Sequence, residues 1–288
     1  MKADYKNWMP KGMIYSFLGG AIGCGAVAIV LNALLNGTLK TVLTVVFAAA
    51  AVVLCGLTVW AVLMHRAFSY DGKRQMSRQI IEGTAAHVKL PRGGKCLDVG
   101  CGSGALAIAV AKRNPQAQVV GIDRWGKEYA SFNKNLCESN ARAEGVKNIS
   151  FRQGDATHLD FADETFDAVV SNYVYHNIPG KAASLAEQSY SSTKSWNDTA
   201  RIIDSGHVTA RQKYLLETLR TLKKGGTFAL HDIFSRSKYG DMQAFVKLLK
   251  DMGYQKVELI DTTDGRYMSK FEATWMALSG SALLTGIK

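Results

Sequence analysis

The sequence predicts an α/β domain built on a parallel β-sheet and preceded by two membrane-spanning helices. Three observations carry this prediction: two long apolar runs near the N-terminus, an alternation of strand-like and helical segments in the rest of the chain, and a glycine-rich turn after the first of those strands. The chain has 288 residues, of which 47% are apolar. That length accommodates one medium-sized domain with an appendage.

The two apolar runs cover residues 13–35 and 39–64, and Lys40 is the only charged residue within them. Roughly 20 helical residues cross the hydrocarbon core of a bilayer, so each run is long enough to span it. The short stretch 36–38 between the runs favours a turn. We therefore expect a helical hairpin over residues 1–66. A cleaved signal peptide is the alternative, but the first run is too long for one and lacks a small-residue cleavage site.

Basic residues flank the outer ends of this predicted hairpin, whereas its turn carries only Lys40. The flanking residues are Lys2, Lys6, Lys11, His65, Arg66, Lys73, Arg74 and Arg78. Because Lys and Arg are enriched on the cytoplasmic side of spanning helices, both termini and the following domain are expected in the cytoplasm, at the cell membrane. Gly19 and Gly23 are four residues apart and allow close helix approach, which offers a route to a homo-oligomer through the hairpin.

The net charge is +11, from 35 basic and 24 acidic residues, and part of it lies beside the apolar runs, where it suits an anionic membrane surface. Basic runs interleaved with aromatic residues are lacking, so nucleic acid is not a predicted partner. The five cysteines are scattered without zinc or redox spacing. We predict no metal site and expect reduced thiols, as in a cytoplasmic compartment.

The remaining residues, 67–288, are predicted to form one α/β domain. A basic helix is expected over residues 72–90. The strand-like segments that follow are Lys95–Val99, Gln118–Ile122, Ile149–Gln153, Ala168–Ser171 and Thr227–His231, with helical segments near Ala105–Arg113, Lys127–Glu144 and Ala210–Leu222. Such alternation predicts parallel strands joined by right-handed crossovers. Residues 180–206 interrupt the pattern and are expected to form an insert that covers the strand ends.

The glycine-rich turn follows the first predicted strand. Its glycines remove side chains where the backbone must turn tightly and approach a ligand; they are Gly100, Gly102 and Gly104. This Gly-x-Gly-x-Gly spacing differs from the dinucleotide pattern Gly-x-Gly-x-x-Gly and disfavours a dehydrogenase. Asp98 precedes the glycines and is placed to accept hydrogen bonds from an amine or from loop amides. Asp123 ends the second strand, where a carboxylate can bind both hydroxyls of a ribose.

In these motifs the chain resembles the class I S-adenosylmethionine-dependent methyltransferases, over residues 72–288. The matching segments are Leu97–Gly104, Asp123, Gly154–Ala156, Phe166–Asn172 and Leu222–Gly226. The resemblance implies a Rossmann-like seven-stranded sheet with a C-terminal antiparallel hairpin, fitted by Tyr254–Ile260 and Ala273–Leu284. It also implies S-adenosylmethionine as the cofactor, with the Asp155 carboxylate at the adenine amino group. The cofactor-binding residues that we predict are Asp98, Gly100, Cys101, Gly102, Gly104, Asp123, Arg124, Gly154, Asp155, Ala156 and Asn172.

The segment Ser171–Pro179, after the fourth strand, is where this family places residues that face the methyl acceptor. It lacks the Asn-Pro-Pro-Tyr sequence of many nucleic-acid and protein amine methyltransferases and is more similar to the small-molecule and lipid-quinone enzymes. His176 is the predicted general base, because imidazole can take up a proton near neutral pH. The other predicted catalytic residues are Tyr173, Tyr175 and His231, and Asp232 is a further candidate.

We therefore expect a membrane-anchored enzyme that moves a methyl group from S-adenosylmethionine to a small, lipophilic acceptor. Tethering favours such an acceptor because it raises the encounter rate with molecules dissolved in the bilayer. Two alternatives stay open: a methyltransferase of membrane-proximal protein, and a membrane sensor or scaffold that binds S-adenosylmethionine without catalysis. Labelled protein would indicate the first, and binding without turnover the second.

Overall fold

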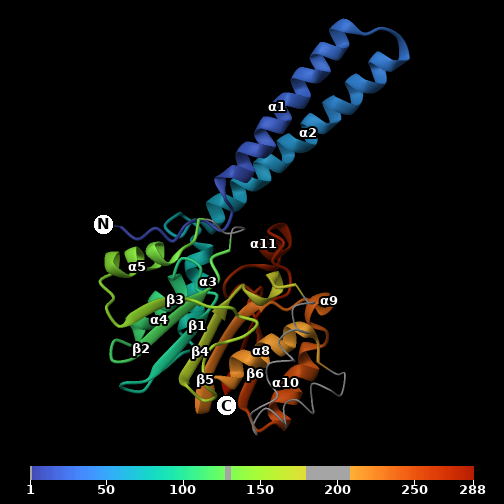
Figure 1. The fold of residues 1–288 in the computed structure, drawn as a ribbon. Coiled ribbons are helices and arrows are strands. Elements are labelled where there is room, and N and C mark those ends of the chain that lie inside the picture. The colour runs from blue at the N-terminus through green and yellow to red at the C-terminus, as the bar shows by residue number, and fades with distance from the viewer. Residues whose placement is uncertain (1, 127–130, 180–207) are drawn as a thin grey trace. The chain divides into compact units, whose positions relative to one another are not determined.

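A computed structural model of the chain describes residues 2–126, 131–179 and 208–288 (Figure 1). The predicted insert at 180–206 lies outside these residues. The chain divides into two compact units. One unit comprises Lys6–Arg78, and the other combines Met1–Tyr5 with Gln79–Lys288.

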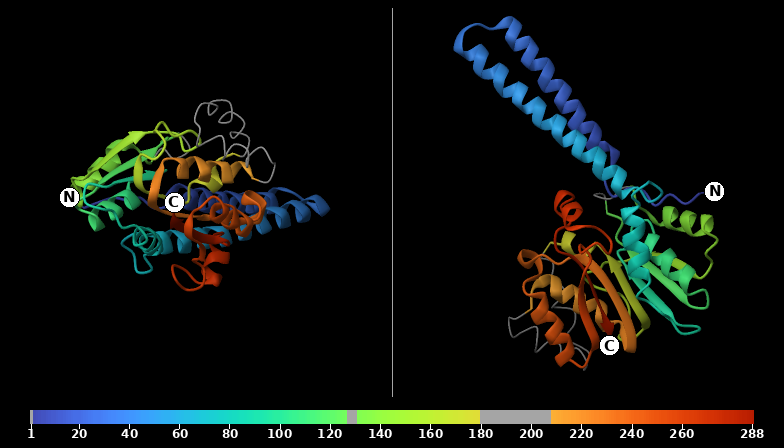
Figure 2. Two further views of the ribbon diagram at one scale, coloured as in Figure 1. Left: turned by 90° about the horizontal axis from the view of Figure 1, so that it is seen from below. Right: turned by 180° about the vertical axis from the view of Figure 1, so that it is seen from behind.

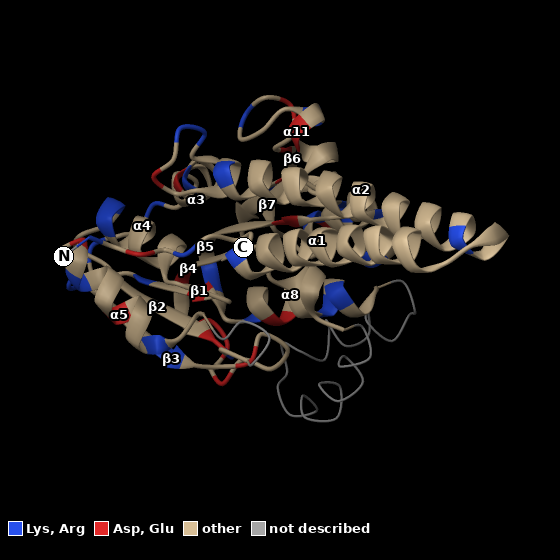
Figure 3. Ribbon diagram, turned by 90° about the horizontal axis from the view of Figure 1, so that it is seen from above, with Lys and Arg blue, Asp and Glu red and all other residues tan. Residues whose placement is uncertain are grey.

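The smaller unit is a helical hairpin of α1 (Lys11–Leu34) and α2 (Gly37–Phe68), both long and apolar enough to cross a membrane. Figure 3 shows how few Lys and Arg residues the two helices carry, and neither contains an Asp or Glu. The predicted turn at 36–38 was too long, because α2 already begins at Gly37. Only two residues, Leu35 and Asn36, therefore join the helices.

A glycine of α1 lies close to α2, but it is not one of the two predicted from spacing. A Cβ at Gly20 would lie 3.2 Å from Cδ1 of Leu54. No described atom lies within 4 Å of a Cβ built at Gly19 or Gly23. Gly20 therefore permits the close approach of the two helices, and self-association through Gly19 and Gly23 stays a prediction.

The larger unit carries a seven-stranded sheet in the order β3-β2-β1-β4-β5-β7-β6 (Figure 2). The strands are β1 (Lys95–Val99), β2 (Gln118–Asp123), β3 (Ile149–Gln153), β4 (Phe166–Asn172), β5 (Leu222–Ile233), β6 (Gln255–Asp261) and β7 (Ser281–Ile287). The first five pair in parallel, and β7 runs antiparallel to both β5 and β6. This order confirms the predicted Rossmann-like sheet with a C-terminal antiparallel hairpin.

The helices differ more from prediction than the strands do. In the larger unit and at its boundary they are α3 (Met76–Ala85), α4 (Ala105–Arg113), α5 (Lys134–Ala143), α8 (Ala210–Arg220), α9 (Arg236–Tyr239), α10 (Met242–Asp251) and α11 (Lys270–Trp275). The helix predicted over 72–90 is therefore much too long. Its start is delayed because Gln75 has a positive φ of 49°, which a helix does not accommodate.

The seventh strand was also predicted wrongly, since it begins at Ser281 and not at Ala273. A capping box starts α11 instead: the Ser269 hydroxyl accepts from the N–H of Glu272, whose carboxylate accepts from the N–H of Ser269. The apolar residues of this region resemble a strand, whereas the Ser-x-x-Glu sequence at 269–272 indicates the start of a helix.

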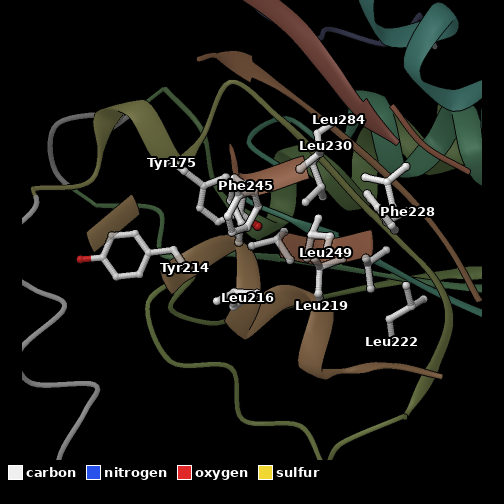
Figure 4. Close-up of a cluster of buried hydrophobic side chains, with 14 of the residues drawn as sticks. Tyr175, Tyr214, Leu216, Leu219, Leu222, Phe228, Leu230, Phe245, Leu249 and Leu284 are labelled. Atoms are coloured by element: carbon white, nitrogen blue, oxygen red, sulfur yellow. The ribbon is translucent and has the colours of Figure 1, made fainter. Parts of the chain in front are cut away.

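Helices α4 and α8 lie on opposite faces of the sheet (Figures 1 and 2). A large part of the core lies between the sheet and the pair α8 and α10. Figure 4 shows Leu219 of α8 and Phe245 and Leu249 of α10 next to Leu230 of β5, and all four side chains are buried. Such packing fixes the positions of the strands, whose carboxyl ends carry the candidate site.

Candidate active site

The glycine turn between β1 and α4 is fastened to the end of the neighbouring strand β2. The N–H groups of Gly100 and Cys101 both donate to the carbonyl oxygen of Ile122, at 2.8 and 2.9 Å. Gly100 has a φ of 74°, and a Cβ at this position would overlap the side chain of Val174. Only glycine fits there, so the segment after β4 can pack directly against the turn.

Asp98 lies at the foot of this turn and is 1% exposed. Neither of its carboxyl oxygens makes a well-formed hydrogen bond with a described residue. Burial raises the pKa of Asp98 to about 8; the Ala107 amide opposes this rise, and the Asp123 carboxylate adds to it. A buried carboxyl group without a partner is costly, and a cationic amine beside it would supply both donors and charge. This residue therefore fits the amino group of S-adenosylmethionine.

Asp123 is held between the glycine turn and the residues that follow β2. Its Oδ2 accepts from the N–H of Gly102 at 2.8 Å, and its Oδ1 accepts from the N–H of Trp125 at 2.7 Å. The Trp125 indole N–H donates in turn to the Gly102 carbonyl oxygen at 3.0 Å. No described atom lies within 4 Å of a Cβ built at Gly102. The turn thus leaves room for a ligand beside an oriented carboxylate.

The other predicted cofactor residues also lie at the carboxyl ends of the strands. After β3, the N–H of Gly154 donates to the Asp123 carbonyl oxygen at 3.0 Å. Asp155 is exposed, and its Oδ1 accepts from both the N–H and the hydroxyl of Thr157 at 2.8 Å. The remaining positions are Arg124, exposed directly after β2; Cys101, buried in the turn; Ala156, packed against the core; and Asn172, the last residue of β4.

A buried carboxylate, Asp232 near the end of β5, organises the segment that follows β4. Its Oδ2 accepts from the N–H groups of Tyr175 and His176, at 2.9 and 3.2 Å, and from the Tyr239 hydroxyl at 2.9 Å. Its Oδ1 accepts from the N–H of Ile233 at 2.7 Å and lies 2.5 Å from His176 Nδ1. These donors fix the carboxylate, and the carboxylate in turn fixes the imidazole ring of His176.

This arrangement leaves the second ring nitrogen of His176, Nε2, as the one that can accept a substrate proton. The side chain of His176 is 13% exposed, so the ring is mostly but not wholly shielded from solvent. Sequence reasoning named both His176 and Asp232 but had no means of pairing them. Parallel pairing of β4 with β5, in which Asn172 lies beside His231, brings the two residues together.

His231 is placed differently from the prediction that it acts in catalysis. Its Nδ1 lies 2.8 Å from Asn172 Oδ1, and its Nε2 lies 2.9 Å from Thr262 Oγ1. Burial lowers the pKa of His231 to about 3, against the opposing effect of the Asp232 carboxylate. The ring is therefore neutral near pH 7, with both nitrogens engaged. Neither nitrogen is open to a substrate proton, which argues for a positioning role instead.

The two predicted catalytic tyrosines occupy contrasting environments. The backbone of Tyr173 has a φ of 55°, a conformation that is rare for aromatic residues and concentrated at functional sites. Its ring centroid lies 4.7 Å from that of His231 and 5.9 Å from that of His176. Tyr175 is 1% exposed, and its hydroxyl lies 2.6 Å from Thr218 Oγ1 on α8. Burial in the core argues against the predicted catalytic contact for Tyr175.

Two polar residues that the sequence did not mark complete this side of the site. Tyr173 Oη lies 2.8 Å from Ser281 Oγ, and Thr262 Oγ1 lies 3.0 Å from the Ser281 carbonyl oxygen. Thr262 and Ser281 stand at the two ends of the β6–β7 connection, and no local motif distinguishes them. Within the described ranges, no group of three or more His, Cys, Asp or Glu side chains is arranged to hold a metal ion.

The strand order and the glycine turn together define a Rossmann-like methyltransferase fold. A comparison with protein families matches residues 90–272 to a family described as methyltransferase domain. The match covers more than half of the chain, and the chain belongs to this family. The predicted class, an enzyme of the methyltransferase family with S-adenosylmethionine as its cofactor, is thereby confirmed.

Curated relatives match shorter stretches. The chain is 34% identical over 105 residues to the demethylmenaquinone methyltransferase of Lactobacillus johnsonii, covering 35% of this chain and 40% of that protein. It is 32% identical over 114 residues to the release factor glutamine methyltransferase of Aliivibrio fischeri, covering 40% of this chain and 37% of that protein. The matches thus span about two fifths of each relative. The crystal structure of YcgJ from Bacillus subtilis is similar with a TM-score of 0.45 and 17% identity, covering 74% of this chain and 98% of that one.

Proposed function

We propose that this protein is a membrane-anchored methyltransferase that methylates a small, lipophilic acceptor carrying an acidic hydroxyl group or ring carbon. The observation that carries this proposal is the position of His176. Its imidazole is oriented by Asp232, and it lies in the same segment whose Val174 packs against Gly100 of the cofactor turn. A base beside the cofactor site is useful when the acceptor must lose a proton.

The chain's own residues divide the work of binding and proton transfer. S-adenosylmethionine, when bound, supplies an electrophilic methyl group on a sulfonium. Asp98 would hold its amino group, Asp123 its ribose and Asp155 its adenine. His176 Nε2 would accept the acceptor's proton, while Asp232 keeps the ring oriented and stabilises the imidazolium that forms.

Asn172, Tyr173 and His231 would shape the wall of the acceptor pocket. Their side chains form one hydrogen-bonded and ring-stacked group with Thr262 and Ser281. Such a group holds aromatic surfaces in place without carrying charge, because His231 is neutral. A rigid, uncharged wall suits an apolar ring system.

The lipophilic character of the acceptor is supported from two directions. The relative from Lactobacillus johnsonii is named for demethylmenaquinone, which points to a quinone-type acceptor. The helices α1 and α2 have the length and composition of bilayer spans, and their flanking cations favour termini in the cytoplasm. An enzyme tethered in this way meets acceptors that are dissolved in the same bilayer.

A methyltransferase of membrane-proximal protein is the second candidate, since the relative from Aliivibrio fischeri is named for a protein substrate. It is less well supported, because Asn172 is followed by Tyr-Val-Tyr and not by the Pro-Pro-Tyr sequence of many such enzymes. A sensor that binds the cofactor without turnover is the remaining alternative. With radiolabelled cofactor the two methyltransferases give different labelled products, and the sensor gives none.

The test uses the purified full chain in lipid nanodiscs with S-adenosylmethionine that carries a labelled methyl group. Membrane lipid extract, water-soluble extract and membrane protein are offered separately, with Asp98→Ala as the blank. We expect label in the lipid extract and loss of turnover, with retained cofactor affinity, in His176→Gln. Label in water-soluble compounds alone contradicts a lipophilic acceptor. Labelled protein supports the second candidate, and stoichiometric binding without S-adenosylhomocysteine supports a sensor.

A further inference from the structure

Exposed large apolar side chains have an uneven distribution in this protein. In the part of the chain that the structure describes, all but two of them belong to α1 and α2. The two exceptions are Phe271, which is 76% exposed, and Trp275, which is 46% exposed. Both lie on α11, in the connection between β6 and β7. Among the described residues of the larger unit, the most exposed large apolar side chains thus lie at one place.

The two aromatic residues form a defined surface. They are four positions apart on α11 and therefore project from the same side of the helix. Their rings are stacked, with centroids 6.4 Å apart and an angle of 9° between the ring planes. The opposite side of the segment packs inward through Ala273 and Met276, which are buried. Its position is therefore fixed by packing and does not depend on the exposed rings.

The chemistry of this surface fits a lipid headgroup layer. Lys270 adjoins the aromatic pair on the helix, and Arg266 precedes it in the same connection; both are exposed. Trp and Phe side chains beside Lys and Arg are typical of segments that lie in a membrane interface, where the rings enter the acyl boundary and the cations meet phosphates. The chain also carries two helices of bilayer length.

We propose that α11 rests in the lipid surface, with Phe271 and Trp275 inserted below the headgroups and Lys270 and Arg266 at the phosphates. This inference rests on the membrane anchoring in the proposed function. It goes further, because it assigns a second, peripheral contact with the bilayer to the catalytic unit itself.

The position of α11 in the sheet gives this contact a role. Strand β6 runs in the same direction as β5, since both are antiparallel to β7, so the β6–β7 connection begins at the edge where β5 ends. At one end of the connection Thr262 contacts His231, and at the other Ser281 contacts Tyr173. The lipid contact is therefore directly connected to the acceptor side of the site. A lipophilic acceptor would enter from the bilayer along α11.

The first test measures tryptophan fluorescence of the full chain in nanodiscs with and without brominated acyl chains, which quench nearby indoles. Trp275→Phe is the matched control, because it removes one indole and keeps an aromatic ring. The difference in emission between the two proteins is the emission of Trp275. We expect the brominated lipid to quench it. Emission from Trp275 that is insensitive to bromine overturns the proposal.

The second test separates a lipid contact from a protein contact by kinetics. In Phe271→Ser/Trp275→Ser we expect KM for a bilayer-embedded acceptor to rise by about tenfold or more, because burying one aromatic side chain contributes at least that factor. KM for a short-chain, water-soluble analogue should stay unchanged, and Phe271→Leu/Trp275→Leu should retain most of the affinity. Equal changes for both acceptors, or loss of an oligomer in the serine variant, contradict a lipid surface.

The two proposals can fail independently. If no acceptor of any class is methylated, the proposed function is wrong, and the bromine quenching of Trp275 alone decides whether α11 contacts lipid. If a lipophilic acceptor is methylated while Trp275 is unquenched, the function stands and the lipid contact of α11 is wrong.

Discussion

At the residue scale, the Asp232 carboxylate is the most heavily hydrogen-bonded group of the candidate site, and three of its contacts hold the segment that carries His176. Asp232→Asn replaces an acceptor with a donor that faces backbone N–H groups. We expect kcat to fall by about 100-fold, as for loss of general base catalysis, while cofactor affinity is retained. The pH profile of kcat/KM checks this role.

Tyr239→Phe serves as the control for that substitution, because it removes one of the hydrogen bonds to Asp232 and leaves His176 Nδ1 paired. It should lower kcat much less than Asp232→Asn. If Asp232→Asn lowers thermal stability but leaves the acid limb of the pH profile in place, Asp232 is a structural residue and does not orient a base.

The Asp98 carboxyl group is expected to lower the stability of the folded chain and to strengthen the binding of the cofactor. Burial raises the pKa of its carboxyl group to about 8 in the folded chain, whereas the pKa of an unfolded Asp is about 4. The folded chain therefore holds more protons between these values, and its stability falls as the pH rises through that window. Asp98→Asn should stabilise the cofactor-free chain by about 2 kcal/mol or more at pH 8 and abolish cofactor binding.

Thermal unfolding of the detergent-solubilised chain at pH 5 and pH 8, with cofactor titration by calorimetry, measures both effects. The stabilisation should be larger at pH 8 than at pH 5. A variant that is less stable than the unaltered chain at both pH values would show that Asp98 has a favourable partner in the folded state.

At the element scale, α5 joins the N-terminal segment to the glycine turn. Asn140 Oδ1 accepts from the N–H of Asp4 at 2.7 Å, and Asn140 Nδ2 donates to the carbonyl oxygens of Asp4 and Ser103, both at 3.0 Å. Asn140→Ala removes these hydrogen bonds, including the buried one to Ser103, so we expect the Kd for S-adenosylmethionine to rise by about threefold to tenfold. Calorimetric titration measures the change.

Glu138→Ala is the matched substitution on the same helix, since it removes only a solvent-exposed ion pair with Lys134. Its Kd for the cofactor should be close to that of the unaltered chain. An equal rise in both variants would mean that α5 affects the turn through general stability and not through Asn140.

The bounds of a helix or strand could be predicted correctly where the residues within and directly beside it specify where it begins and ends. Strands β1 and β3 were predicted with their observed bounds. In β1 four of five residues are buried, as in the apolar run that marks a buried parallel strand, whereas β3 is an edge strand in which only Phe151 is buried. Helix α4 was also predicted correctly, directly after the glycine turn. The region from Ala273 failed, because its apolar residues serve a short helix whose cap was not recognised.

At the scale of the whole molecule, the proposed membrane anchoring makes a topological prediction. Lys40, in the first turn of α2, should face the outer side, and Lys73, beyond α2, should face the cytoplasm. We expect a membrane-impermeant thiol reagent to label Lys40→Cys in intact cells and Lys73→Cys only after permeabilisation. The unaltered chain is the control, because it already contains five cysteines.

Labelling of Lys73→Cys in intact cells, with protection of Lys40→Cys, would reverse the proposed topology. Release of the chain from membranes by alkaline carbonate would show that α1 and α2 do not span the bilayer. In that case only the similarity to demethylmenaquinone methyltransferase would still support the proposed lipophilic acceptor.

The sequence by itself determined the class of this protein, because its signals are local: the glycine turn from Gly100 to Gly104, the apolar lengths of α1 and α2, and the alternation of strands and helices. Only the tertiary structure decided which side chains cooperate. His176 meets Asp232 from 56 residues away, and Asn140 meets Asp4 from 136 residues away. These pairs follow from strand order and core packing, which no local pattern specifies. The exposure of Phe271 and Trp275 on α11 is likewise a property of the folded chain.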